Sequence, residues 1–113
     1  MQTRRIAVLL NRNAQGVRPS VVRRAAALIE ARDLFVTSSR EEAREAARTM
    51  IARGTEVVCV GGGDGTFIQA AADLLAEAAI AGRAPPMLLP LRLGSGNAIA
   101  DVAGASANSG RGL

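Results

Sequence analysis

One segment constrains the fold of this chain more than any other. The apolar run 57–60 (Val-Val-Cys-Val) stops abruptly at four glycines that surround Asp64, and Thr66 then opens a long amphipathic stretch. Glycine lets the backbone turn sharply and lets a bulky anion approach the main-chain N–H groups, and the N-terminal end of a following helix favours phosphate. A carboxylate in such a loop would repel phosphate unless it acts through Mg²⁺ or on an attacking hydroxyl. The segment therefore predicts a strand, a nucleotide-phosphate loop and a helix.

Apolar runs and amphipathic stretches alternate along the chain. Each apolar run is short and continuous, which is typical of a strand in a parallel sheet that is covered on both faces. The predicted strands are 5–10, 34–37, 56–60 and 87–91, and the predicted helices begin near Pro19, Ser39, Thr66 and Ala98. This order predicts an α/β fold, a three-layer parallel sheet with flanking helices. We expect one domain over 1–103 and a disordered tail over 104–113, where small and polar residues predominate.

Composition narrows the chemistry and the partners. The chain has no Lys, His or Tyr, so general acid–base chemistry falls to Asp or Glu. The net charge of +4 comes from scattered arginines that mostly alternate with Glu on predicted helix faces, which argues against a nucleic-acid partner. Cys59 lies in a predicted strand, so we expect a buried apolar residue. A single cysteine excludes an internal disulfide, and no apolar run is long enough to span a bilayer, so the expected location is cytoplasmic.

Three unusual loops follow predicted strands: 11–16, 61–65 and 94–97. The C-terminal ends of parallel strands lie at one edge of a sheet, so these loops should gather at the rim where open α/β sheets bind ligands. Two familiar nucleotide motifs do not fit. A Walker A loop requires Lys, and a dinucleotide fingerprint requires a glycine at the position of Thr66 and an acid about twenty residues further on.

The third predicted helix carries two acids, Asp73 and Glu77, at a spacing of i and i+4. Such a pair resembles paired catalytic carboxylates. Both residues point away from the apolar stripe of the helix, however, and we therefore expect them on a solvent-exposed face.

The glycine-rich segment resembles a known signature. Gly62-Gly63-Asp64-Gly65-Thr66 is similar to the GGDGT motif of the diacylglycerol kinase catalytic domain family, whose superfamily includes sphingosine kinases, bacterial lipid kinases and, more distantly, NAD kinases. The segment 90–97 (PLRLGSGN) resembles the family's P-L-G-T-G-N segment, with two residues added before the glycine. Asn11 resembles the Asn that opens the family's N-P-x-S-G loop, with Arg12 in place of the proline. The resemblance runs from the first strand to Asp101.

The resemblance implies ATP as phosphoryl donor, Mg²⁺, and a lipid hydroxyl as acceptor, which the protein would reach from the cytoplasm at the membrane periphery. Asp64 would be the catalytic acid and would act on Mg²⁺ through water. The nucleotide-binding positions that the resemblance implies are Asn11, Asn13, Thr37, Gly62, Gly63, Gly65, Thr66, Ser95 and Gly96. Structural alternatives stay open, because aspartate is common in turns and a serine before a helix is a common cap.

Full-length members of the family carry a larger C-terminal β-rich domain that supplies the acceptor pocket. The chain resembles the N-terminal, nucleotide-binding half alone, so we expect an ATP-dependent lipid kinase fragment that binds nucleotide with little or no turnover. The alternatives are an NAD-kinase-like phosphotransferase and a non-catalytic nucleotide-binding module. A sheet edge left exposed would favour homo-oligomers.

Overall fold

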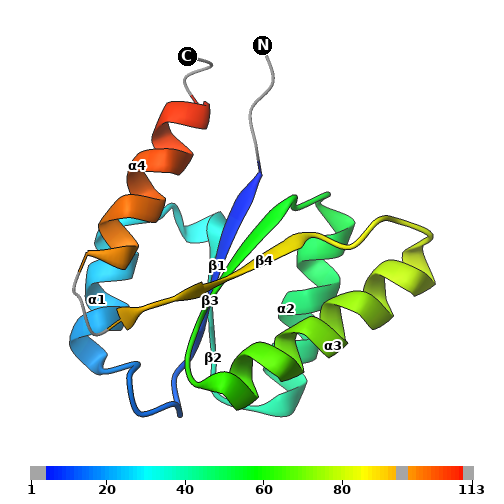
Figure 1. Ribbon diagram of the computed structural model, residues 1–113, viewed down its shortest axis with the longest axis horizontal. Coiled ribbons are helices and arrows are strands. Elements are labelled where there is room, and N and C mark those ends of the chain that lie inside the picture. The colour runs from blue at the N-terminus through cyan, green and yellow to red at the C-terminus, as the bar shows by residue number, and fades with distance from the viewer. Residues whose placement is uncertain (1–4, 94–96, 111–113) are drawn as a thin grey trace.

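The computed structural model describes residues 5–93 and 97–110 of the chain. Four parallel strands form one sheet in the order β2-β1-β3-β4 (Figure 1). The strands are β1 (Ile6–Asn11), β2 (Leu34–Thr37), β3 (Val57–Gly61) and β4 (Met87–Leu91). The helices are α1 (Pro19–Leu28), the short 3₁₀ helix η1 (Ala31–Asp33), α2 (Arg40–Ala52), α3 (Asp64–Ala81) and α4 (Ala98–Gly110). The predicted α/β fold with a three-layer parallel sheet is confirmed.

Helices cover both faces of the sheet. α2 and α3 pack on one face, and α1 and α4 pack on the other (Figure 1). β1 and β3 lie in the centre, and their apolar residues 7–10 and 57–60 are at most 5 % exposed. This burial on both faces explains why the two runs are continuous rather than alternating.

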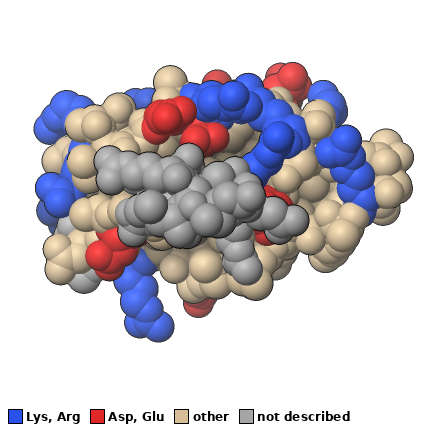
Figure 2. Space-filling view, turned by 90° about the horizontal axis from the view of Figure 1, so that it is seen from above, with Lys and Arg blue, Asp and Glu red and all other residues tan. Residues whose placement is uncertain are grey.

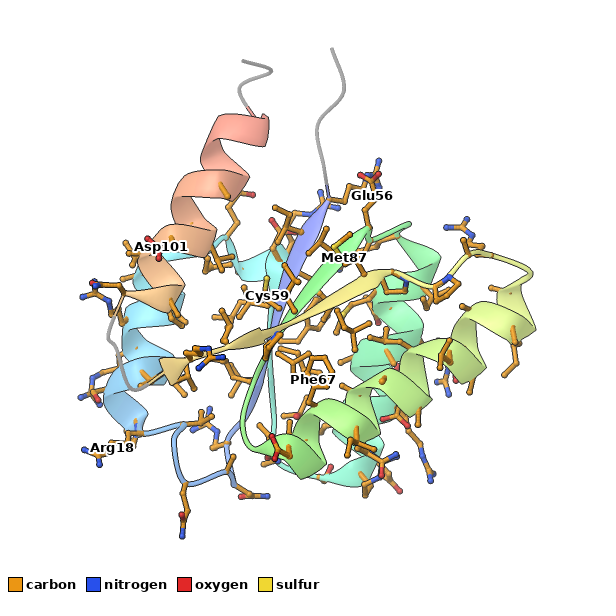
Figure 3. The ribbon with its side chains drawn as sticks, viewed as in Figure 1. Arg18, Glu56, Cys59, Phe67, Met87 and Asp101 are labelled. Carbon is orange, nitrogen blue, oxygen red and sulfur yellow. The ribbon has the colours of Figure 1, made fainter. Side chains whose placement is uncertain are left out.

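Cys59 is part of this buried layer. Figure 3 shows it on β3, in the middle of the sheet. Burial raises the pKa of its thiol, which keeps the sulfur neutral. The residue is therefore the small buried apolar group that the sequence predicts.

The boundaries of α2 and α3 follow from local chemistry. Ser39 is the N-cap of α2, and its hydroxyl accepts a hydrogen bond from the Glu42 amide at 3.1 Å. α3 ends at Gly82, whose φ of 67° is left-handed and is unfavourable for residues with a side chain. Both boundaries agree with the prediction.

The last helix differs from the prediction. The sequence predicts helix only to 103 and a disordered tail from 104, whereas α4 continues to Gly110; residues 111–113 lie outside the described residues. Ile99, Val102 and Ala103 pack against the cluster that α1 shares with the sheet, and their spacing matches one helical face. This contact stabilises the start of the helix, and the small residues that follow continue it. The helical spacing of the three apolar residues was not used in the prediction, which relied on the small and polar composition of the segment.

Arginines at the amino edge of the sheet stabilise the fold. Arg83 Nη1 donates to the carbonyl oxygen of Ile51 at 2.9 Å, in the last turn of α2, where carbonyl groups have no partner within the helix. The Arg53 guanidinium lies 5.8 Å from the centre of the Phe35 ring. Figure 2 views this edge of the molecule and shows acidic side chains among the basic ones. Some of the arginines thus have partners within the protein itself.

β4 is an edge strand with a proline in it. The Met87 amide donates to the Glu56 carbonyl oxygen at 2.9 Å, so N–H groups at alternate positions from Met87 onward point toward β3. Pro90 falls in the other set, whose donor direction is away from the sheet. Its missing N–H therefore costs the β3–β4 ladder nothing. Met87 and Leu89 are 55 % and 44 % exposed on this strand, and Figure 3 marks Met87.

Met50 provides a test of the core between α2 and the sheet. Its side chain is fully buried, whereas Ile80 on α3 is 79 % exposed. Met50→Ala should lower the free energy of unfolding by about 2–5 kcal/mol, because the lost contacts leave a cavity. Ile80→Ala is the control and should change it by less than about 0.5 kcal/mol. Urea unfolding monitored by circular dichroism measures both, and equal losses would contradict this account of the core.

Candidate functional site at the carboxyl edge of the sheet

A side-chain hydrogen bond joins two of the predicted loops. Asn11 ends β1, and its Nδ2 donates to Oγ1 of Thr66, in the first turn of α3, at 3.0 Å. β3 reaches the same place, because only Gly62 and Gly63 separate its last residue, Gly61, from the start of α3. Leu93, just after β4, lies so close to Gly61 that its Cδ1 would be 3.2 Å from a Cβ placed there. The exits of β1, β3 and β4 are therefore neighbours, as the topology predicts.

The loop after β1 is also fastened to the end of β2. Asn11 Oδ1 accepts from the Asn13 amide at 3.0 Å, which fixes a tight turn. Asn13 Nδ2 donates to the Ser38 carbonyl oxygen at 2.8 Å, and the Arg12 amide donates to the Thr37 carbonyl oxygen at 2.7 Å. Among the described residues, Thr37 is the one polar residue that is buried. Asn11, Asn13, Thr37 and Thr66 thus lie along one rim.

The glycines of the loop have two different structural roles. Gly62 has a φ of 153°, and a Cβ there would lie 2.8 Å from atoms of Thr66, so only glycine fits without strain. Gly63 and Gly65 have ordinary backbone angles, and a Cβ at either would meet nothing within 4 Å. The packing of the chain itself therefore explains Gly62 and leaves Gly63 and Gly65 without a structural requirement.

The N-terminus of α3 faces this open space. Gly63 is its N-cap, and among the described residues no side chain hydrogen-bonds to the cap. The first N–H groups of a helix have no partner within the helix, and together with the helix dipole they form an anion-binding end. The loop can therefore receive a phosphate group on its main-chain amides.

Asp64 is the first residue of α3 and is exposed to solvent. A carboxylate at this position also stabilises the helix dipole, so the residue has a structural interpretation beside the catalytic one. The described residues contain no group of three or more Asp, Glu, Cys or His side chains that could hold a metal ion. A role for Asp64 on a Mg²⁺ ion that is mainly coordinated by phosphate oxygens stays a prediction.

A cavity of about 220 Å³ continues from the loops into the space between α2 and α3. Its rim is polar and includes the predicted residues Asn11, Asn13 and Thr37; its floor is apolar and includes Met50 and Leu74. The glycines of the loop are not part of its lining. Ser95 and Gly96, the remaining predicted positions, lie outside the described residues.

Most of the cavity lining was absent from the predicted site, and it includes a linked group of three polar side chains: Arg40, Gln69 and Asp73. Arg40 is the first residue of α2, and its Nη2 and Nη1 donate to the two carboxylate oxygens of Asp73 at 2.9 and 3.1 Å. Gln69 Nε2 donates to the same carboxylate at 3.3 Å. The ion pair therefore bridges α2 and α3 at the edge of the cavity.

The prediction that Asp73 and Glu77 lie on a solvent-exposed face is wrong. The side chain of Asp73 is 11 % exposed and that of Glu77 is 19 % exposed, and both face α2, where Glu77 Oε1 lies 3.8 Å from Arg48 Nε. Arg40 and Arg48 are eight residues apart on α2 and face acids four residues apart on α3. The two spacings differ, so the positions of the acids on α3 alone do not indicate these partners; the pairing depends on the two helices being adjacent.

Glu42, in the first turn of α2, holds the segment that carries the rim. Its Oε1 accepts from the amide and the hydroxyl of Ser38 at 2.7 and 3.0 Å, and the Ser38 carbonyl oxygen in turn holds Asn13. The backbone hydrogen bond from Ser38 is the main cause that lowers the pKa of Glu42, followed by the bond from the Ser38 hydroxyl. A chain of hydrogen bonds therefore connects the first turn of α2 to the predicted nucleotide loop.

Comparison with known proteins gives one result for nearly the whole chain. Residues 5–111 match the family model described as the diacylglycerol kinase catalytic domain. A search of curated proteins found no match. None of the helices in the described part of the chain is long and apolar enough to cross a membrane.

The lowered pKa of Glu42 predicts a pH-dependent contribution to stability. The contribution is present above the ordinary value of 4.5 and is lost as the pH falls through the lower folded value, because the protonated acid no longer accepts both bonds. Glu42→Gln should therefore be less stable than the natural chain at pH 7, and the difference should shrink by pH 3. Glu41→Gln, in the same helical turn, is the control for the helix dipole. Urea unfolding across this pH range checks the trend, and a difference that stays constant would contradict it.

Proposed function

Because the chain belongs to the diacylglycerol kinase catalytic domain family, a family of phosphotransferases, we propose that it binds ATP with Mg²⁺ at the carboxyl edge of its sheet. The reaction it serves is transfer of the γ-phosphate to a lipid hydroxyl, with a diacylglycerol-like acceptor. One observation carries the proposal: Gly63 and Gly65 leave open space beside the uncapped N-terminus of α3, where the fold itself needs no glycine.

The phosphates are the part of the ligand that the loop would receive. Main-chain amides at the start of α3 donate to phosphate oxygens, and the absence of Cβ atoms at Gly63 and Gly65 lets those oxygens come close. Asn11 holds Thr66 and thereby keeps the first turn of α3 beside the loop after β1. The donors are thus already oriented before a ligand arrives, which reduces the entropy cost of binding.

The nucleoside is the part that the cavity would receive. Its volume of about 220 Å³ is below the range of about 300–1,000 Å³ that is usual for whole ligands. The cavity therefore suits one part of a nucleotide, with the phosphates extending over the open loop. Apolar side chains on the floor can contact the flat face of a base, and the asparagines on the rim can hydrogen-bond to the sugar.

Asp64 is the acid placed nearest to the phosphates. Bound Mg²⁺ would neutralise charge on the transferring phosphate, which is the main requirement of this chemistry. Asp64 would orient a water molecule on that ion or accept a hydrogen bond from the attacking hydroxyl. Its position in the first turn of α3 keeps the carboxylate at the loop in either role.

Gly65→Ala separates binding from folding. An added methyl group meets nothing in the protein and raises helix propensity, so stability should increase by about 0.5–1 kcal/mol. The same methyl group would occupy the space of a phosphate, so the affinity for Mg·ATP should fall at least about tenfold, or about 1.4 kcal/mol. Calorimetric titration and urea unfolding measure the two effects.

Gly104→Ala is the matched control, because Gly104 lies within α4 with nothing within 4 Å of an added Cβ. It should be stabilised without any change in ATP affinity. Unchanged binding in Gly65→Ala, or a natural chain that binds NAD in preference to Mg·ATP, would refute the proposed site; the second result would favour an NAD-kinase-like activity.

Asp64→Asn tests the role of the acid. The substitution should make ATP binding less dependent on Mg²⁺, while ATP without Mg²⁺ should still bind. Asp101→Asn is the control, since Asp101 is also an acid in the first turn of a helix, and Figure 3 shows it on α4, away from the loop. Titrations at several Mg²⁺ concentrations measure the effect. Identical Mg²⁺ dependence in both variants would remove Asp64 from the site.

A further inference from the structure

We propose that the Arg40–Asp73 ion pair is a positioning clamp, which holds α2 and α3 at the separation that the nucleoside part of the ligand requires. The inference rests on the proposed nucleotide function and assigns a role within it to two residues outside the glycine loop. It predicts that the pair determines how much more tightly the chain binds a nucleoside triphosphate than bare triphosphate.

The two helices meet at the cavity mainly through small side chains. Ala43 and Ala47 of α2 and Ala70 of α3 line the cavity, and the larger Met50 and Leu74 form its floor. The space exists because alanines from both helices face it. Because these side chains are short, they do not by themselves fix the separation of the two helices beside the cavity, and a contact at its edge can do so.

The ion pair is such a contact. Two parallel N–H···O bonds between a guanidinium and a carboxylate fix distance and orientation more strictly than a single bond does. Gln69, one turn before Asp73 on the same helix, donates to the same carboxylate and limits its rotation. The side chain of Asp73 is only 11 % exposed, so its charge depends on these partners.

The position of the pair relates it to the ligand. Arg40 and Asp73 both line the cavity, together with Asn11, Asn13 and Thr37 of the rim. The second ion pair between the same helices, Arg48 with Glu77, is not part of the cavity lining and has a longer separation of 3.8 Å. The chain therefore contains an internal control, a bridge between the same two helices at a distance from the site.

The test compares two probes, Mg·ATP and inorganic triphosphate with Mg²⁺, by calorimetry on the full chain. Arg40→Gln and Asp73→Asn should each weaken ATP binding about tenfold and change triphosphate binding less than about twofold. The double variant Arg40→Asp with Asp73→Arg restores an ion pair of opposite direction and should recover most of the ATP affinity. Glu77→Gln should leave both affinities unchanged.

Three results would overturn the clamp. Equal affinity of the natural chain for ATP and triphosphate would show that the nucleoside adds nothing, while the phosphate site would stand. Failure of the charge exchange to restore ATP binding would show that Arg40 acts by touching the ligand. An equal loss in Glu77→Gln would show a general effect on stability. If neither probe binds the natural chain, the proposed function itself fails.

Discussion

The hydrogen bond from Asn11 to Thr66 is the interaction on which the arrangement of the site depends. It connects residues that are 55 positions apart and unites the end of the first strand with the start of the third helix. An amide suits this position because its two atoms have opposite requirements: the oxygen accepts from the Asn13 amide, and the nitrogen donates to the threonine hydroxyl. A carboxylate could only accept at both positions, so it would require the threonine hydroxyl to turn and donate instead. The rim of the sheet is thus organised by one side chain that serves both loops.

Much of the fold could be predicted from the sequence because the information is local. The runs at 7–10 and 57–60 are continuous and buried at every residue, which is typical of central strands in a parallel sheet covered on both faces. Ser39 and Gly82 mark helix ends through bonds and backbone angles that involve few neighbours. The convergence of the loops followed from topology alone, since parallel strands end at one edge.

The parts that could not be predicted depend on which elements become neighbours. Asp73 faces α2 because α2 and α3 share one face of the sheet, and a helical pattern of one segment does not contain that fact. The extension of α4 depends in the same way on Ile99 and Val102 reaching the surface of α1 and the sheet. Within the glycine motif, local structure accounts for one glycine and not for the others. Gly62 is fixed by its backbone angle and its contact with Thr66, whereas an added Cβ at Gly63 or Gly65 meets nothing within 4 Å, so the packing of the chain does not require glycine there.

Pro90 has a consequence for anything that contacts the outer side of β4. A polypeptide laid alongside this strand would find a rung of the hydrogen-bond ladder absent at its middle, so main-chain pairing would be interrupted after one or two residues. The exposed Met87 and Leu89 still offer apolar surface there. A neighbouring segment would therefore have to gain its binding energy by covering those two side chains. The addition of a further β-strand to this edge through main-chain hydrogen bonds alone is thus unfavourable.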